Sequence, residues 1–273
     1  MLFLAKSKIL RKTMKGIILA GGSGTRLLPL TATTSKQLLP VYDRQMIFYP
    51  INTLVKAGIR DILIIVAPEH SGQFLNLLGS IFSPYGVQIS FVVQKTPRGL
   101  ADAFILGEDF LDDDSVAMIL GDNIFEDDFT EAMASFVSGG RIFALEVPDP
   151  ERFGVVEFNE SGTVLSIEEK PETPKSTFAI PGMYIFDNRV CEIAKSVKPS
   201  ARGEIEITEI HNAYLQEGAL DVRKLSGKWF DAGTFETLLD AAVFAREKRL
   251  GEGFDPIVNE AIREYNQEAK KSR

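Results

Sequence analysis

A glycine-rich segment near the N-terminus carries the first residues that could do chemistry. Its sequence is GIILAGGSGTRLLPLTATTSKQLLP, and three glycines and two cations stand out in it: Gly21, Gly22, Gly24, Arg26 and Lys36. Glycine lets backbone N–H groups approach a phosphate closely, and Arg and Lys side chains neutralise its charge. Two structures fit the segment: a loop that holds a triphosphate, or a tight turn after a strand with two solvated cations.

Two other phosphate-binding motifs fit this segment less well. A P-loop ends in Gly-Lys-Ser/Thr, and this triplet does not occur in the chain. A dinucleotide loop needs G-x-G-x-x-G, but Leu27 stands at the third glycine position. Asp43 does follow at about the 20 residues that such a loop requires. Pro29 and the threonines after it, however, would interrupt the helix that the motif begins.

Two aspartates could hold a metal ion. Asp122 follows an apolar run at residues 116–120, and ligands of α/β sheets bind beyond the carboxyl ends of strands. Asp231 lies in WFDAGT, far away in the sequence. Magnesium prefers one or two carboxylates together with phosphate and water oxygens. Each aspartate also suits a plain turn, Asp122 in Gly-Asp-Asn and Asp231 beside Trp229, and the residues alone leave both possibilities open.

The first half of the chain must supply the framework for these residues. Apolar, β-branched runs occur at 16–20, 62–67, 89–93, 116–120 and 142–147. Segments with helical spacing lie between them at 45–57, 71–78 and 100–110. Strands that alternate with helices indicate an α/β fold, here a Rossmann-like, doubly wound and mostly parallel sheet with helices on both faces.

The pattern changes after Pro148. VVEFNESGTVLSIEEKP alternates apolar and polar residues around a turn, which predicts a β-hairpin and a β-rich insertion. Helical spacing returns at three segments, 189–196, 206–217 and 235–250. We expect one domain at 14–250, with halves at 14–147 and 148–250. A charged and solvated helical tail should follow at 251–273. A disordered extension should precede the domain at 1–13, and Met1 and Met14 are alternative starts.

Composition excludes several function classes. The 273 residues carry a formal net charge of -8 and a pI near 5.0, which argues against a nucleic-acid-binding surface. No apolar run approaches the roughly 20 residues that span a bilayer, so we expect no membrane partner. The single cysteine, Cys191, cannot form an internal disulfide, and a reducing cytoplasm fits this.

Several strings of the chain together resemble one family. LAGGSGTRLLPLT, SKQLLPVYD, LGDNIF, RFGVVEF, EEKP, ARGEIEIT and WFDAGT occur in the order typical of sugar-1-phosphate nucleotidylyltransferases, and are most similar to the branch that uses dTTP and glucose 1-phosphate. The resemblance covers about residues 14–245. It implies a Mg²⁺-dependent in-line displacement at the α-phosphate, which yields dTDP-glucose and pyrophosphate. The product would serve deoxysugar and cell-surface polysaccharide biosynthesis. The resemblance also implies a homo-oligomer, namely a tetramer.

The resemblance also implies roles for single residues. The implied catalytic residues are Arg26, Lys36, Asp122, Lys170 and Asp231, of which Asp122 and Asp231 hold the metal. Nucleotide contacts are implied for Leu19, Gly21, Gly22, Gly24, Thr25, Arg26, Gln37, Gln94, Gly99 and Asp122. Sugar-phosphate contacts are implied for Gly154, Glu169, Lys170 and Tyr184. The half at 14–147 would thus bind the nucleotide, and the half at 148–250 the sugar.

The chain departs from the family pattern in places. It reads Asp-Arg-Gln-Met-Ile where members usually have D-K-P-M-I, and WFDAGT where they have WLDTGT. Beyond Ala245 it departs from longer members, whose C-terminal helices help to build a regulatory site, so feedback control does not follow. Use of UTP stays an alternative, because thymine and uracil share the edge that Gln94 would read. A non-catalytic nucleotide-sugar-binding regulator is a further alternative, against which the five catalytic residues argue.

Overall fold

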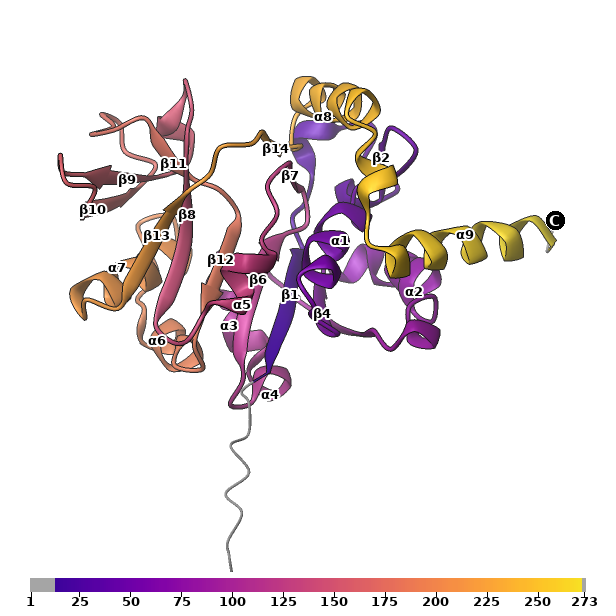
Figure 1. Ribbon diagram of the computed structural model, residues 1–273, viewed down its shortest axis with the longest axis horizontal. Coiled ribbons are helices and arrows are strands. Elements are labelled where there is room, and N and C mark those ends of the chain that lie inside the picture. The colour runs from indigo at the N-terminus through magenta and orange to yellow at the C-terminus, as the bar shows by residue number, and fades with distance from the viewer. Residues whose placement is uncertain (1–12, 272–273) are drawn as a thin grey trace, which may run out of the picture.

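The computed structural model describes residues 13–271, and these form a mixed, mostly parallel sheet covered by helices (Figure 1). Within this range ten strands join into one sheet in the order β10-β9-β11-β8-β12-β6-β1-β4-β5, with β13 beside β8. The predicted α/β class is confirmed. The predicted extension lies outside the described residues, apart from Thr13.

The centre of the sheet is parallel, as the apolar runs predict. Its strands are β1 (Met14–Ala20), β4 (Asp61–Val66), β5 (Gln88–Val93) and β6 (Ser115–Leu120). β1 pairs in parallel with both β4 and β6. Because all four strands run the same way, their carboxyl ends lie along one edge of the sheet, where side chains that follow the strands can gather.

Each face of the sheet carries its own core. Ile17 and Ile18 are fully buried neighbours whose side chains point to opposite faces, as the period of a strand requires. The face of Ile18 is covered by α1 (Phe48–Lys56), α2 (Ser71–Leu78), α5 (Thr130–Ala134) and α8 (Phe235–Glu247). The face of Ile17 is covered by α3 (Asp102–Leu106), α4 (Glu108–Leu111), α6 (Val190–Ser196) and α7 (Ile207–Gln216).

The second half of the chain extends the same sheet. Its strands are β8 (Gly140–Glu146), β9 (Gly154–Phe158), β10 (Val164–Glu169), β11 (Phe178–Ile180), β12 (Met183–Phe186) and β13 (Leu220–Lys224). β9 and β10 form the predicted hairpin. β12 runs antiparallel between β6 and β8, so the two halves share one continuous sheet.

Two predicted helices differ from the expectation. The helix predicted at 45–57 begins at Phe48, because β2 (Pro40–Val41) and β3 (Arg44–Gln45) pair around a turn in which Tyr42 has a φ of 61°. The helix predicted at 100–110 is divided at Gly107 into α3 and α4. In both cases a local turn interrupts a segment whose apolar spacing is helical.

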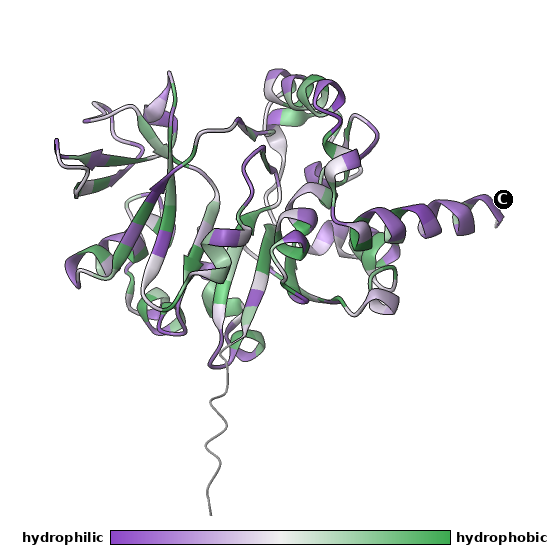
Figure 2. Ribbon diagram, viewed as in Figure 1, coloured by the Kyte–Doolittle hydropathy of each residue, from purple (hydrophilic) through white to green (hydrophobic). Residues whose placement is uncertain are grey.

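The C-terminal helix is only partly solvated. α9 (Pro256–Lys271) packs against α1, and Val258 and Ala261 are buried in the core on that side. Burying a valine side chain contributes about 1.5–3 kcal/mol, so this end of the tail is part of the fold. The distal part is hydrophilic and projects away from the domain (Figure 2). None of the helices in residues 13–271 is long and apolar enough to cross a membrane.

Candidate active site

The glycine loop follows β1 and does not begin an α-helix. Its residues lead into two short 3-10 turns, Thr25–Leu27 and Lys36–Leu38. Gly24 has a φ of 64°, which suits glycine, and its carbonyl accepts a hydrogen bond from Thr31 Oγ1 at 2.8 Å. The helix that a dinucleotide-binding loop would require is thus absent from this described segment.

Asp122 lies directly after β6, where the sheet places ligands. It is buried, its Oδ2 forms an ion pair with Lys36 Nζ, and its Oδ1 accepts from Asn123 Nδ2 at 3.2 Å. Burial alone would raise the pKa of Asp122, but the charge and hydrogen bond of Lys36 outweigh it and hold the pKa below the usual value. Asp122 is therefore an anion beside a cation at the carboxyl edge of the sheet.

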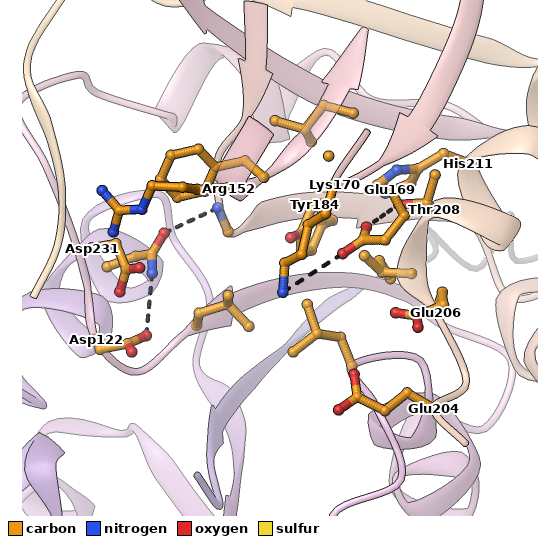
Figure 3. Close-up of a pocket in the computed structure, with 18 of the residues that line it drawn as sticks. Asp122, Arg152, Glu169, Lys170, Tyr184, Glu204, Glu206, Thr208, His211 and Asp231 are labelled. Atoms are coloured by element: carbon orange, nitrogen blue, oxygen red, sulfur yellow. Dashed lines mark hydrogen bonds and ion pairs between the residues drawn. The ribbon is translucent and has the colours of Figure 1, made fainter. Parts of the chain in front are cut away.

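A two-stranded ladder brings Asp231 to the same place. β14 (Trp229–Asp231) pairs antiparallel with β7 (Asn123–Phe125), and Asp231 lies opposite Asn123. The indole N–H of Trp229 donates to Asn123 Oδ1 at 2.7 Å and fixes the ladder. Burial and the negative charge of Asp122 raise the pKa of Asp231. Figure 3 shows the two carboxylates side by side at one end of a pocket.

This pair of carboxylates suits a magnesium ion. Among residues 13–271 no group of three or more His, Cys, Asp or Glu side chains could hold a metal by itself. Magnesium, however, usually takes only one or two protein carboxylates, with phosphates and water as its other ligands. Burial and the nearby charge of Asp122 both raise the pKa of Asp231, and a cation bound by the two carboxylates would relieve this repulsion. The residues present therefore fit the ion.

A first cavity of about 210 Å³ lies between the glycine loop and Gln94. Seven of the residues with implied nucleotide contacts line it, namely Leu19, Gly21, Gly22, Gln37, Gln94, Gly99 and Asp122, and Lys36 lines it too. Gly24 and Thr25 do not line it. Gly21 is tightly packed, because a Cβ there would lie 2.9 Å from Gln94 Oε1. Gln94 itself is buried and is held by Asp102, a residue that the sequence interpretation missed.

Gly99 closes this cavity with a backbone that other residues cannot adopt. Its φ is 103°, and a Cβ would lie 2.4 Å from the carbonyl oxygen of Ile205. The same contact includes hydrogen bonds from Ala101 N to Ile205 O at 3.2 Å and from Ile205 N to Arg98 O at 2.6 Å. The loop before α3 is thus joined to the loop before α7.

A second cavity of about 290 Å³ contains the residues with implied sugar contacts. Gly154, Glu169, Lys170 and Tyr184 all line it, together with Arg26, Asp122 and Asp231. Arg26 therefore lies with Asp231 and not in the first cavity. Glu169 Oε2 accepts from Thr208 Oγ1 at 2.5 Å. Lys170 has a φ of 43° and a half-exposed side chain, whose Nζ lies 4.0 Å from Glu169 Oε1.

The two cavities meet. Asp122, Leu100, Leu120 and Glu204 line both of them. A molecule in the first cavity and a molecule in the second would therefore approach each other at Asp122. Because Lys36 and Asp231 flank this carboxylate, the meeting point has the charges needed to bring two anionic groups and a metal ion together.

Several residues of the second cavity were not assigned from the sequence. Arg152, Arg202, Glu206, Thr208 and His211 line it. The first four lie in the strings RFGVVEF and ARGEIEIT, which carried the resemblance without a role for these side chains. His211 lies three residues after Thr208, and this spacing places both on one face of α7. That spacing is the signal that could have identified it.

His211 is held in an apolar setting. It is buried beside the rings of Tyr184 and Phe186, at centroid distances of 5.3 and 6.0 Å. Neither ring nitrogen has a hydrogen-bond partner among the described residues. Burial lowers the pKa of His211 to about 3, so the ring is neutral at physiological pH. It adds a polar but uncharged wall to the second cavity.

The comparisons with known proteins agree with this geometry. The model of the family described as nucleotidyl transferase matches residues 15–248. A glucose-1-phosphate thymidylyltransferase of Neisseria meningitidis is 54% identical over 239 residues, which cover 85% of this chain and 83% of that protein. The enzyme of the same name from Mycolicibacterium smegmatis is 52% identical over 245 residues, or 88% of this chain and 85% of that one.

Solved structures show the same fold. A Bacillus anthracis structure assigned to glucose-1-phosphate thymidylyltransferase, in complex with sucrose, has a TM-score of 0.81 and 45% identity, and covers 86% of this chain and 96% of its own. A UDP-glucose pyrophosphorylase complexed with UDP-glucose has a TM-score of 0.74 at 25% identity, and covers 86% of this chain and 100% of its own. Both the family match and the relatives extend over most of the chain, and the protein therefore belongs to the nucleotidyl transferase family.

Proposed function

We propose that this protein joins dTTP to α-D-glucose 1-phosphate and releases pyrophosphate and dTDP-glucose. The observation that carries the proposal is that Asp122 lines both cavities, pairs with Lys36 and lies close enough to Asp231 to raise its pKa. A nucleotide in the first cavity then meets a sugar phosphate in the second. The relatives named glucose-1-phosphate thymidylyltransferase support this choice of substrates.

The proposed reaction is a single displacement. An oxygen of the sugar 1-phosphate forms a bond to the α-phosphorus of dTTP, while the bond from that phosphorus to the bridging oxygen of pyrophosphate breaks. No covalent intermediate on the protein is needed. The protein holds the two anions in contact and neutralises their charge, and well-oriented reactants alone lower such barriers by roughly 7–11 kcal/mol.

Each charged residue then has a role in the nucleotide half of the reaction. Lys36, which pairs with Asp122 in this structure, turns to the phosphates near the reacting centre when they bind. Arg26 binds the β- and γ-phosphates and the departing pyrophosphate. Asp122 and Asp231 would hold a magnesium ion, which would supply charge neutralisation at the phosphate oxygens. Gln94 and the backbone of Gly99 read the pyrimidine edge.

The second cavity takes the sugar phosphate. Lys170 binds its phosphate, and its half-exposed side chain has the freedom to reach a ligand in the cavity. Glu169 accepts hydrogen bonds from sugar hydroxyls and is held in place by Thr208. Gly154 and Tyr184 complete the wall around the ring. These residues come from β9, β10, β12 and α7, apart from Lys170, which directly follows β10.

A pyrophosphate-release assay tests the proposal. Purified protein is given Mg²⁺ and each common nucleoside triphosphate with several sugar 1-phosphates, and dTTP with glucose 1-phosphate should give the highest kcat/KM. UTP is the second candidate, because the UDP-glucose pyrophosphorylase shares the fold at 25% identity. A clear preference for ATP, GTP or CTP overturns the proposal. Binding of a nucleotide sugar without turnover under any condition would favour a regulatory protein instead.

Three wider features remain part of the proposal. We infer one catalytic unit at residues 14–250, with a nucleotide half at 14–147 and a sugar half at 148–250, followed by a C-terminal tail at 251–273. The sheet that runs through both halves supports a single unit. We also infer a homo-oligomer, for which the family resemblance is the support. A reducing, cytoplasmic setting agrees with the single and buried Cys191.

A further inference from the structure

We propose that Asp102 is a positioning residue that fixes the orientation of the Gln94 amide and thereby decides which pyrimidine the first cavity accepts. The inference rests on the proposed function, because it assumes that a nucleotide base occupies this cavity. Asp102 is 1% exposed, although it carries a carboxylate at the start of α3. A buried carboxylate is costly unless its oxygens are occupied, so the partners of Asp102 indicate its role.

Both oxygens of Asp102 are occupied by donors. Oδ2 accepts a hydrogen bond from Gln94 Nε2 at 2.8 Å, and Oδ1 accepts from Arg98 Nη2 at 2.5 Å. An amide group has a donor end and an acceptor end, whereas a carboxylate only accepts. Asp102 can therefore bind only the nitrogen end of Gln94. The opposite orientation would place the amide oxygen against a carboxylate oxygen.

The hydrogen bond to Asp102 determines which end of the Gln94 amide faces the cavity. With Nε2 held by Asp102, Oε1 lies on the side of the glycine loop, where a Cβ on Gly21 would be 2.9 Å away. Gly21 and Gln94 both line the first cavity. An acceptor there pairs with a base that carries an N–H at ring position 3, as thymine and uracil do. Cytosine has an unprotonated nitrogen at that position, so two hydrogen-bond acceptors, this nitrogen and Gln94 Oε1, would face each other.

A pair of nucleotides tests the base reading to which this orientation contributes. dTTP and 5-methyl-dCTP have the same sugar, phosphates and ring methyl group, and differ only at ring positions 3 and 4. Sites built to hydrogen-bond a substrate reject a mismatched analogue by roughly 10⁴–10⁵ in kcat/KM. We expect wild-type protein to reject 5-methyl-dCTP by about this factor, and comparable kcat/KM for the two nucleotides would overturn the inference without any variant.

Asp102→Asn replaces the carboxylate by an amide of nearly the same shape, and so changes what position 102 can donate or accept. Arg98 retains the oxygen end of the new amide, so its nitrogen end turns to Gln94, which must then flip and present its own nitrogen to the base. The ratio of kcat/KM for dTTP to that for 5-methyl-dCTP should fall by about tenfold or more. Arg98→Ala is the matched control, because Asp102 still binds Gln94 there, and the ratio should stay at the wild-type value.

A double-mutant cycle separates positioning from general damage. In a Gln94→Ala background the amide is gone, so adding Asp102→Asn should leave the nucleotide ratio unchanged. An unaltered ratio in Asp102→Asn alone, or an equal effect with and without Gln94, contradicts the inference. If wild-type protein turns over neither nucleotide, the proposed function fails instead, and the two failures are thus distinguishable. Should Asp102→Asn not fold, comparable kcat/KM of wild-type protein for the two nucleotides would still overturn the inference.

Discussion

The backbone N–H of Ala232 donates to the carbonyl oxygen of Asp122 at 3.0 Å, so Asp231 and Asp122 are held together by main-chain contacts. The β7–β14 ladder continues from this hydrogen bond. The separation of the two carboxylates therefore depends on backbone geometry as well as side-chain rotamers. We therefore expect the proposed metal site to be pre-formed before substrates bind.

We expect Asp122→Asn and Asp231→Asn each to lower kcat by roughly 100–1,000-fold, because each removes a charge that positions the same ion. The double variant should be scarcely slower than either single one, since residues that act through one ion are not additive. Steady-state kinetics at saturating Mg²⁺ measures this, with melting temperature as the control for folding. Near-normal kcat in either variant, or losses that multiply, would rule out a shared ion.

Gln94→Ala and Lys170→Ala should separate the two cavities kinetically. Gln94→Ala removes the polar partner of the base and should raise KM for dTTP more than for glucose 1-phosphate. Lys170→Ala removes a cation from the second cavity and should do the reverse. Initial rates with each substrate varied in turn give both KM values for each of the two variants. Equal changes in both KM values in either variant would contradict the division of the site.

Gly99→Ala should damage both cavities at once. The positive φ and the contact of 2.4 Å with the Ile205 carbonyl leave no room for a methyl group, so the loops before α3 and α7 must separate. We expect a loss of about 2 kcal/mol or more in the free energy of unfolding, measured in urea, and a higher KM for both substrates. Gly72→Ala is the control: a Cβ at this position of α2 would meet nothing within 4 Å beyond the helix's own backbone and its chain neighbours, and stability should be unchanged or slightly higher.

His211 predicts a pH dependence of stability. Burial holds its pKa at about 3, whereas an unfolded chain has a histidine pKa of 6.5, so the unfolded state binds more protons between these values. Stability attributable to this group is constant above pH 6.5 and falls as the pH decreases toward 3. From pH 7.5 to 5.5 wild-type protein should lose about 1.4 kcal/mol more unfolding free energy than His211→Leu does. Parallel slopes in the two proteins would show that His211 titrates normally.

The sequence identified what depends on local pattern. The parallel strands were predictable because a fully buried strand requires a continuous β-branched run, as at Ile62 to Ile65. The hairpin around Asn159 was predictable from turn chemistry. By contrast, β12 has four residues and β7 and β14 have three each, too few for a period to be recognised. Their places in the sheets depend on pairing between distant segments.

The same distinction applies to the candidate site. Glycines, cations and Asp122 are visible because they follow strands, and position relative to a strand is a local property. Nothing local distinguishes Asp102 from the other acidic residues in its neighbourhood, since its importance comes from burial and from the partners Gln94 and Arg98. His211 is similar, because an unpaired imidazole is recognised only when its surroundings are known.

The position of β12 between β6 and β8 bears on how the chain is made. When a ribosome has released the first 147 residues, the central parallel strands β1, β4, β5 and β6 are available, but β12 is not, so β6 has an open edge and β8 has no neighbour on that side. The open edge is apolar, with Val116 to Ile119 fully buried in the finished protein. Such an edge invites pairing with other chains. We therefore expect the nascent chain to be prone to aggregation until residues 183–186 emerge, and a fragment of residues 14–147 to be less stable than the whole chain.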